Sequence, residues 1–408
     1  MKFYLYKNKT NIKEYTIRLI EYLFKKYNLE LMDAPEFADI VMVSCCDSSE
    51  IIDIEKAKKH GKPVMVGGMV SEVPIVNELA DYAYHGEIYG LIDFLVGGGV
   101  DLEQCKYITT KNKKALKICE KIKYEDNPVI RVGSRAAYYY CGKGCPVKCK
   151  YCMIGNSRKY QTVPEPLYRK AERSIKKVHG RMMPIAAYNP YAADTERSIT
   201  EVLLRKYIKH DGLGLKKSLI RSGVEFCTKE LSKCIAKGVT IDDLNEAIRI
   251  SKRDNSRMIL YFIAGLETQE QFEDYFSQIT PDYTMTPAVT IVFTYLSPQQ
   301  GTLFADFNLT KRVEFEYRKV FYCITQKNKR FKVMPVSNIK KSTIRCLIER
   351  CETMAEYNLI KELDKKKYSY QDVINHISKK YPRMVGTDDV ATILRARRGR
   401  VKKNDYWA

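Results

Sequence analysis

Four cysteines lie within the segment 141–152, and their spacing is the strongest chemical signal in the sequence. Three of them, Cys145, Cys149 and Cys152, follow a C-x3-C-x2-C pattern on a loop after a predicted strand. Three thiolates from one tight loop can hold three corners of a cubane iron–sulfur cluster and leave its fourth iron open. Cys141 could instead complete a closed zinc site. Because a zinc ribbon pairs two C-x2-C knuckles and this chain has one, the spacing favours the open cluster.

The composition indicates a folded protein in a reducing compartment. Of the 408 residues, 45% are hydrophobic and 29% are charged, which excludes disordered and low-complexity chains. No apolar run approaches the ~20 residues of a membrane span, and the start of the chain lacks a signal-peptide pattern. We therefore expect a cytoplasmic protein with no membrane partner, whose 13 Cys are thiols or metal ligands and not disulfides.

Strand and helix patterns alternate over residues 1–127. Continuous apolar runs at 39–44 and 63–68 predict strands that are buried on both faces of a parallel sheet. The helical patterns between them predict a Rossmann-like, doubly wound α/β domain that ends in a linker. Ligands in such sheets bind beyond the carboxyl ends of the strands. The candidate ligand contacts are therefore Ser44, Gly67, Gly68, Gly86 and Glu87.

A second α/β pattern runs over residues 128–310 and predicts a partial or full α/β barrel, with its site at the carboxyl ends of the strands. Strands are predicted at 135–141, 181–188, 218–225, 258–264 and 290–295. Helices are predicted between them, one of them at 198–207. Residues 311–408 are predicted to form a basic, mostly helical C-terminal domain that includes one long helix at 344–363.

The segment from Tyr140 to Cys152 resembles the signature of radical S-adenosylmethionine (SAM) enzymes, with Tyr151 in its aromatic position. Weaker resemblances follow in the right order at 223–225, at the turn 237–240, at the glycine–acid segment 262–268 and at the Pro-x-x-Gly-Thr loop 298–302. Together they cover about 135–305 and imply a radical SAM partial barrel.

The resemblance also implies the cofactors and their contacts. A [4Fe-4S] cluster on Cys145, Cys149 and Cys152 would bind SAM, and an electron from a donor such as flavodoxin or ferredoxin would cleave it to a 5′-deoxyadenosyl radical. The implied SAM contacts are Tyr151 at the adenine, Ser222 and Glu225 at the ribose, and Gly265 for close backbone approach.

Residues 1–127 resemble the cobalamin-binding domain that precedes the barrel in one class of radical SAM enzymes. There a Gly-Gly turn, here Gly67-Gly68, lets the backbone approach the nucleotide tail of cobalamin. The axial-histidine motif of that class is absent after the first strand. The domain also resembles the first domain of methylthiotransferases, but of their three second-cluster cysteine positions only one is matched, at Cys45-Cys46.

The positive charge lies towards the C-terminal end of the chain. Residues 1–130 hold 18 Lys and Arg against 20 Asp and Glu, whereas residues 311–408 hold 25 against 11, a net charge of +14. This asymmetry predicts a polyanionic partner, most simply nucleic acid. Because a target base must leave its stack to reach a buried radical, tRNA or another structured RNA is favoured over duplex DNA. The predicted phosphate contacts are Arg395, Arg397, Arg398, Arg400, Lys402 and Lys403.

The sequence therefore predicts a radical SAM [4Fe-4S] enzyme that modifies an unactivated carbon, with methyl transfer to RNA as the favoured reaction. One alternative is a methylthiotransferase-like tRNA modification enzyme. Another is a nucleic-acid-binding protein that is not an enzyme and whose metal site is structural.

Overall fold

The structure is a computed structural model. It describes residues 1–7, 14–132, 136–146, 149, 151–152, 159–185, 199–201, 204–214, 219–235, 238–279, 289–299, 302–313, 317–327, 331–334 and 338–396. Within these residues, every helix is too short or too polar to cross a lipid bilayer.

The N-terminal sheet has the strand order of a doubly wound fold. Its strands are β1 (Phe3–Leu5), β2 (Leu31–Met32), β3 (Ile40–Ser44), β4 (Val64–Gly67), β5 (Tyr82–Tyr84) and β6 (Ile108–Thr109). They lie in the order β2-β1-β3-β4-β5-β6, all parallel except β6. The first five follow the flavodoxin-like order, in which ligands bind at the β1/β3 switch point. The expected Rossmann-like domain is thus confirmed.

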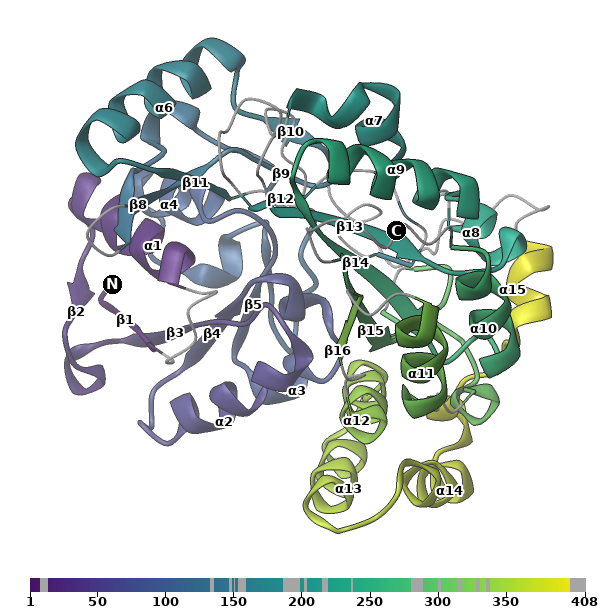
Figure 1. The fold of residues 1–408 in the computed structure, drawn as a ribbon. Helices are drawn as coiled ribbons and strands as arrows, with labels where there is room; N and C mark the ends of the chain where they lie inside the picture. The colour runs from purple at the N-terminus through teal and green to yellow at the C-terminus, as the bar shows by residue number, and fades with distance from the viewer. Residues whose placement is uncertain are drawn as a thin grey trace.

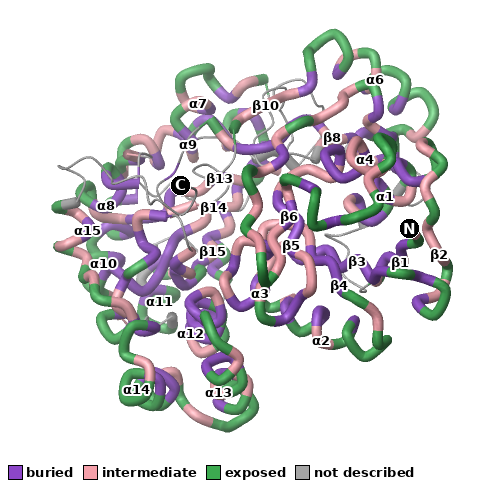
Figure 2. Tube along the Cα trace, turned by 180° about the vertical axis from the view of Figure 1, so that it is seen from behind, coloured by how far each residue is buried: buried purple, intermediate pink, exposed green. Residues whose placement is uncertain are grey.

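Both faces of this sheet are covered, which explains the continuous apolar runs of its strands. On one face Met42 packs with α1 (Glu14–Lys26) and α4 (Tyr89–Val96). On the other face Val41 and Val43 pack with α2 (Ile52–Lys58) and α3 (Val76–Leu79). Because successive side chains point to opposite faces, every residue of β3 is buried, as the trace in Figure 2 shows.

A second set of strands forms the expected part barrel. The first group is β7 (Ile130–Val132), β8 (Ala136–Tyr140) and β11 (Met182–Ile185), and the second is β12 (Ile199–Glu201), β13 (Leu219–Glu225), β14 (Arg257–Ala264), β15 (Val289–Tyr295) and β16 (Lys332–Met334). All neighbours pair in parallel except β7 with β8. A short hairpin, β9 (Gly142–Lys143) with β10 (Gln161–Thr162), flanks the cysteine loop.

Helices between these strands cover the outer face of the barrel sheet (Figure 1). They are α6 (Glu165–His179), α7 (Leu204–Lys209), α8 (Lys229–Cys234), α9 (Ile241–Arg253), α10 (Gln269–Ser277) and α11 (Tyr317–Lys327). The helix predicted at 198–207 is wrong, because its first part is the strand β12. The sheet also continues past residue 310, since β16 pairs with β15.

The C-terminal segment ends in helices, as expected. They are α12 (Ile339–Glu349), α13 (Met354–Lys365), α14 (Tyr370–Lys380) and α15 (Val390–Ala396). The single helix predicted at 344–363 is wrong, because Thr353 and Glu356 form a capping box that starts a new helix at Met354. Short 3-10 turns occur at Pro35–Phe37, Ser48–Glu50, Met69–Glu72, Leu102–Gln104, Tyr124–Asp126, Asp211–Gly214, Leu309–Lys311 and Pro382–Val385.

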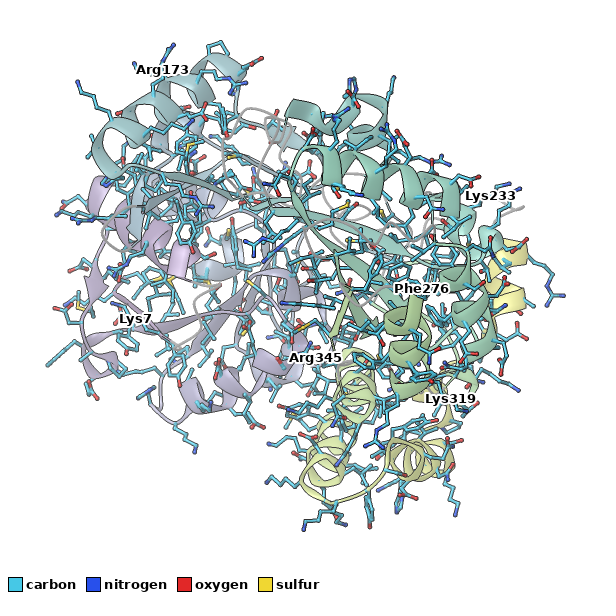
Figure 3. All side chains as sticks on the ribbon, viewed as in Figure 1. Lys7, Arg173, Lys233, Phe276, Lys319 and Arg345 are labelled. Carbon is cyan, nitrogen blue, oxygen red and sulfur yellow. The ribbon has the colours of Figure 1, made fainter. Side chains whose placement is uncertain are left out.

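One apolar core joins the three regions. It contains Val43 from the N-terminal sheet, Phe226 from the barrel and Leu347 from α12. Two ion pairs lie at the same contact. Arg345, labelled in Figure 3, lies 3.5 Å from Asp47, and Lys361 lies 2.6 Å from Glu55. The N-terminal sheet, the barrel and the C-terminal helices therefore bury apolar surface against one another.

This contact contains a carboxyl group that should make stability depend on pH. Burial raises the pKa of Glu349 to about 7, the Asp47 carboxylate adds to the rise, and a hydrogen bond with Ser48 opposes it. The folded state therefore binds the proton of the Glu349 carboxyl group more tightly than the unfolded state does. The free energy of unfolding should fall by about 1–3 kcal/mol as pH rises from about 4.5 to 7.

Urea unfolding of wild type and Glu349→Gln at pH 5.5, 6.5 and 7.5 measures this. The variant should lose this part of the pH dependence and be the more stable protein at pH 7.5. Glu362→Gln, an exposed carboxylate on α13, is the control and should follow wild type. Parallel pH profiles for wild type and Glu349→Gln would contradict the prediction.

Candidate active site

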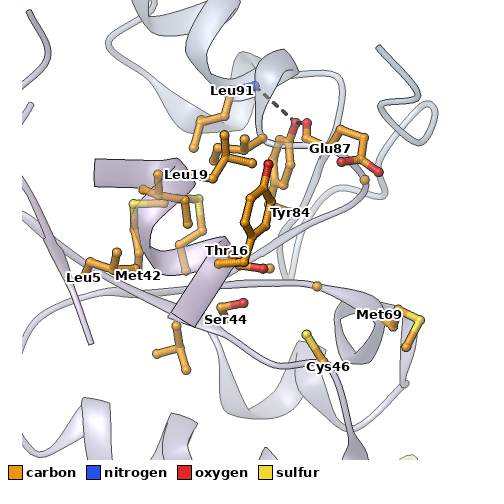
Figure 4. A pocket seen from close by; sticks show the side chains of 18 of the residues that line it. Leu5, Thr16, Leu19, Met42, Ser44, Cys46, Met69, Tyr84, Glu87 and Leu91 are labelled. Atoms are coloured by element: carbon orange, nitrogen blue, oxygen red, sulfur yellow. Dashed lines mark hydrogen bonds between the residues drawn. The ribbon is translucent and has the colours of Figure 1, made fainter. Parts of the chain in front are cut away.

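A cavity of about 240 Å³ opens at the carboxyl ends of the N-terminal strands. Its lining includes all five residues predicted there, namely Ser44, Gly67, Gly68, Gly86 and Glu87. In Figure 4, Ser44 and Cys46 lie across the cavity from Leu91 and Glu87. Tyr84 fixes the loop above it, since its hydroxyl donates to the Glu87 carbonyl and accepts from the Leu91 N–H at 3.1 Å.

The three glycines at this edge have different physical roles. Gly68 has φ +93° and Gly86 has φ +106°, and a Cβ at either one would lie 2.2 Å from a carbonyl oxygen, of Cys45 or Cys119. Close packing of the chain on itself therefore requires these two glycines. A Cβ on Gly67 would meet nothing within 4 Å. Of the three, Gly67 is the one that leaves open space for a ligand.

A pair of stacked tyrosines joins this cavity to the barrel. Tyr15 from α1 and Tyr140 at the end of β8 both line the cavity, with ring centroids 5.9 Å apart and planes 14° apart. Asn127 links them, because its Oδ1 accepts from the Tyr15 hydroxyl at 2.9 Å and its Nδ2 donates to the Tyr140 carbonyl at 2.7 Å. Burial raises the pKa of both hydroxyls, so both stay protonated.

The cysteine loop follows Tyr140 directly. Cys149 is buried, and Cys145 and Cys152 are half-buried, with the Cys152 N–H bonded to the Cys149 carbonyl at 2.9 Å. Cys141 lies apart, in the small core between β8 and α6. The donor set at the end of β8 is thus three thiols, which suits an open cluster. Among the described residues, no group of three His, Cys, Asp or Glu side chains is arranged to hold a metal ion, so the three thiols would have to move together to hold a cluster.

A strained carboxylate faces this loop from β13. Glu225 is 7% exposed and has φ +75°, at a register shift that begins at Gly223. This conformation is costly for a residue with a side chain and is typical of functional sites. The pKa of Tyr151 is raised by burial and further by the charges of Glu225 and Cys149, and its hydroxyl is hydrogen-bonded to Glu225. Two residues predicted separately are therefore in contact.

Ser222 does not join this group. It stands in one row of the sheet with Leu260, Ile291 and Val333, which pack against the covering helices. Its Oγ is buried and has no hydrogen-bond partner among the described residues. The pleat of β13 thus turns Ser222 towards the covering helices.

Gly265 also lies at this end of the barrel, and a buried arginine packs over it. A Cβ on Gly265, which has φ +104°, would lie 3.1 Å from Cγ of Arg312. The Arg312 guanidinium donates to the Leu296 carbonyl at 2.6 Å and to Oγ1 of Thr343 at 2.9 Å, which ties β15 to α12. Sequence reasoning missed Arg312, since nothing in its local pattern marks it as buried.

Glu267, the acid of the glycine–acid segment, forms hydrogen bonds with the loop that follows β13. Glu267 is 1% exposed and accepts hydrogen bonds from the backbone N–H groups of Cys227 at 2.9 Å and Thr228 at 2.5 Å. Burial raises its pKa, and the two backbone bonds oppose the rise. Glu267 therefore holds the loops after β13 and β14 together, next to Glu225.

Part of the predicted phosphate surface cannot be placed. Arg395 lies on α15, whereas Arg397, Arg398, Arg400, Lys402 and Lys403 lie outside the described residues.

Comparisons with known proteins gave structural likenesses. No protein-family description and no curated protein matched the chain. The structure is similar to TsrM, a radical SAM methyltransferase from Kitasatospora setae with cobalamin and a [4Fe-4S] cluster bound, at 11% identity and a TM-score of 0.48 over 72% of each chain. It is also similar to OxsB, a cobalamin-dependent SAM radical enzyme, at 14% identity and a TM-score of 0.49, over 68% of this chain and 52% of OxsB. At such identities and scores, the activity has to be argued from the chain's own residues.

Proposed function

We propose that the chain is a radical SAM enzyme with a [4Fe-4S] cluster on Cys145, Cys149 and Cys152. The observation that supports this most is the contact of the cysteine loop with Glu225 through Tyr151. It places the loop that carries the three cysteines beside a strained, buried carboxylate at the end of β13. Sites of α/β barrels lie at these ends.

Each of these groups has a role in the proposed reaction. When bound and reduced, the cluster supplies the electron that cleaves SAM and starts radical chemistry on the substrate. The three thiols would hold the cluster. The Glu225 carboxylate would accept hydrogen bonds from a ribose, and Tyr151 would orient that carboxylate. Glu267 keeps the two strand-end loops in place. Glu225 and Cys149 are themselves buried, which shields these two side chains from bulk water.

The cysteine assignment is tested by two substitutions. Cys149→Ala should abolish the charge-transfer absorption near ~400 nm and all SAM cleavage, because two thiolates cannot retain the cluster. Cys141→Ala should keep both, because Cys141 lies in the core beside α6. Anaerobic reconstitution with iron and sulfide, followed by absorption spectra and 5′-deoxyadenosine assays, measures this.

Two results would count against the proposal. Loss of iron in Cys141→Ala with retention in Cys149→Ala would refute the ligand assignment. Wild-type protein that holds a reducible cluster but never cleaves SAM would support the structural-metal alternative.

We further propose that the N-terminal cavity receives the nucleotide tail of cobalamin and that the group transferred is methyl. The cavity lies at the strand ends of a doubly wound sheet, where ligands bind. At about 240 Å³ it fits a fragment of such a ligand and not the whole. A methylthio transfer has less support, because Cys45 is buried and Met69 stands at a second-cluster position.

A substitution at Gly67 tests cobalamin binding more directly than one at Gly68. Gly67→Val fills open space, so hydroxocobalamin retention should fall at least about tenfold, a loss of roughly 1.4 kcal/mol, while the iron–sulfur spectrum stays unchanged. Gly68→Ala should instead lower the unfolding temperature without any cofactor, since its Cβ would lie 2.2 Å from the Cys45 carbonyl oxygen. Wild-type protein that never retains cobalamin after anaerobic reconstitution would refute the cobalamin proposal.

We also propose that the substrate is RNA. Besides the charge of residues 311–408, helix α6 supports this with three exposed cations on one stripe, Lys170, Arg173 and Lys177. Arg173 is labelled in Figure 3. None of the three forms an ion pair with a described residue, whereas Arg169 and Lys176 pair with Glu172. Unpaired cations at this spacing suit contacts to phosphates.

Titration of labelled tRNA and duplex DNA at two salt concentrations tests this. Affinity for tRNA should exceed that for DNA and fall by roughly 0.7–0.9 log units per log salt for each phosphate contact. The triple variant Lys170→Gln, Arg173→Gln, Lys177→Gln should bind more weakly with a smaller salt slope. Arg249→Gln is the control, because Arg249 already pairs with Glu246. Negligible tRNA binding by wild type at low salt would refute the RNA proposal.

A further inference from the structure

The inner face of the barrel sheet is the face opposite its covering helices, and its side chains lie in rows across the strands. Backbone pairing places Arg221, Ile259, Thr290 and Lys332 in one row across β13, β14, β15 and β16. Residues of the alternate rows, such as Ile220, Leu260 and Phe293, pack against the helices. By alternation, the row that contains Arg221 therefore points to the inner face.

This inner face is not filled by its own side chains. Closed barrels pack their interior with layers of buried residues. Here Tyr261 and Val292 are half-buried, and Thr294, Lys332 and Met334 are exposed, Met334 at 49%. The helix-facing rows of the same strands are buried throughout. Ile263, in the row of Thr294, is buried in the core shared by the three regions, so the room for another molecule lies against the rows of Arg221 and Tyr261.

The basic side chains on this face and the Glu225 carboxylate lie at different positions along the strands. Arg221 and Lys332 lie in the lower row, and neither forms an ion pair with a described residue. Nε of Arg221 is buried without a hydrogen-bond partner in the described part of the chain. Glu225 lies four residues further along β13, past the register shift that pairs it with Phe262. That is a rise of roughly 13 Å.

We propose that Arg221 and Lys332 bind an anionic group of the substrate, a carboxylate or a phosphate. This rests on the proposed function, because it directs the other end of the substrate towards Glu225 and the cysteine loop. A buried guanidinium nitrogen without a partner is costly, and a carboxylate or phosphate oxygen would satisfy it. Tyr261 and Met334 lie in the row above and contact the body of the substrate.

Ligand-observed NMR titration of the full chain tests this with matched probes. Uridine 5′-monophosphate against uridine tests a phosphate, and N-acetylphenylalanine against its amide tests a carboxylate. For wild type, the anionic member of at least one pair should bind at least tenfold more tightly than the neutral member. Arg221→Gln and Lys332→Gln should each remove most of this difference. Arg221→Lys should keep part of it, since the charge remains but the planar fork is lost.

Lys233→Gln, on the covering helix α8, is the matched control and should behave as wild type. Preference for the phosphate probe would identify a nucleotide as the source of the anion, and preference for the carboxylate an amino acid or peptide. Equal affinity of wild type for charged and neutral probes, or an unchanged preference in Lys332→Gln, would overturn the proposal. Because the probes need no cluster, this outcome is distinct from failure of the cysteine tests.

Discussion

The apolar core shared by the three regions fixes the geometry on which the rest of the molecule depends. The N-terminal sheet buries one face against its own α2 and α3 and, beyond them, against the barrel and α12. A parallel sheet needs both faces covered. Since that cover comes partly from other regions, the strand ends that form the cavity are held beside the barrel. The stacked pair Tyr15–Tyr140 lies at this junction.

The elements that were predicted well are those whose sequence pattern is set by local burial. The buried strands β3 and β4 are continuous apolar runs, and this pattern alone predicted that Ser44, Gly67 and Gly68 at their carboxyl ends line a ligand site. The helix predicted at 198–207 begins in what is the strand β12. Its three residues are paired to one described neighbour, and so short an edge segment carries no periodicity.

The site was predicted in part, because contacts between distant strands leave no local signal. Glu225 and Tyr151 were each selected from a motif, but only the fold shows that they touch. Ser222 was selected from the same strand and faces the helices, because a period of two residues separates the faces. Arg312 and Glu267 act through backbone partners that lie elsewhere in the chain, so spacing alone could not reveal their roles.

The amide of Asn127 has a consequence for how the protein matures. It accepts a hydrogen bond from the Tyr15 hydroxyl of α1 and donates one to the carbonyl of Tyr140, the last residue of β8, immediately before the cysteine loop. That residue also stacks on Tyr15, so the start of the loop has its native position only once α1 has docked. We therefore expect metal insertion to follow folding of the N-terminal sheet, which makes cluster content a readout of folding order.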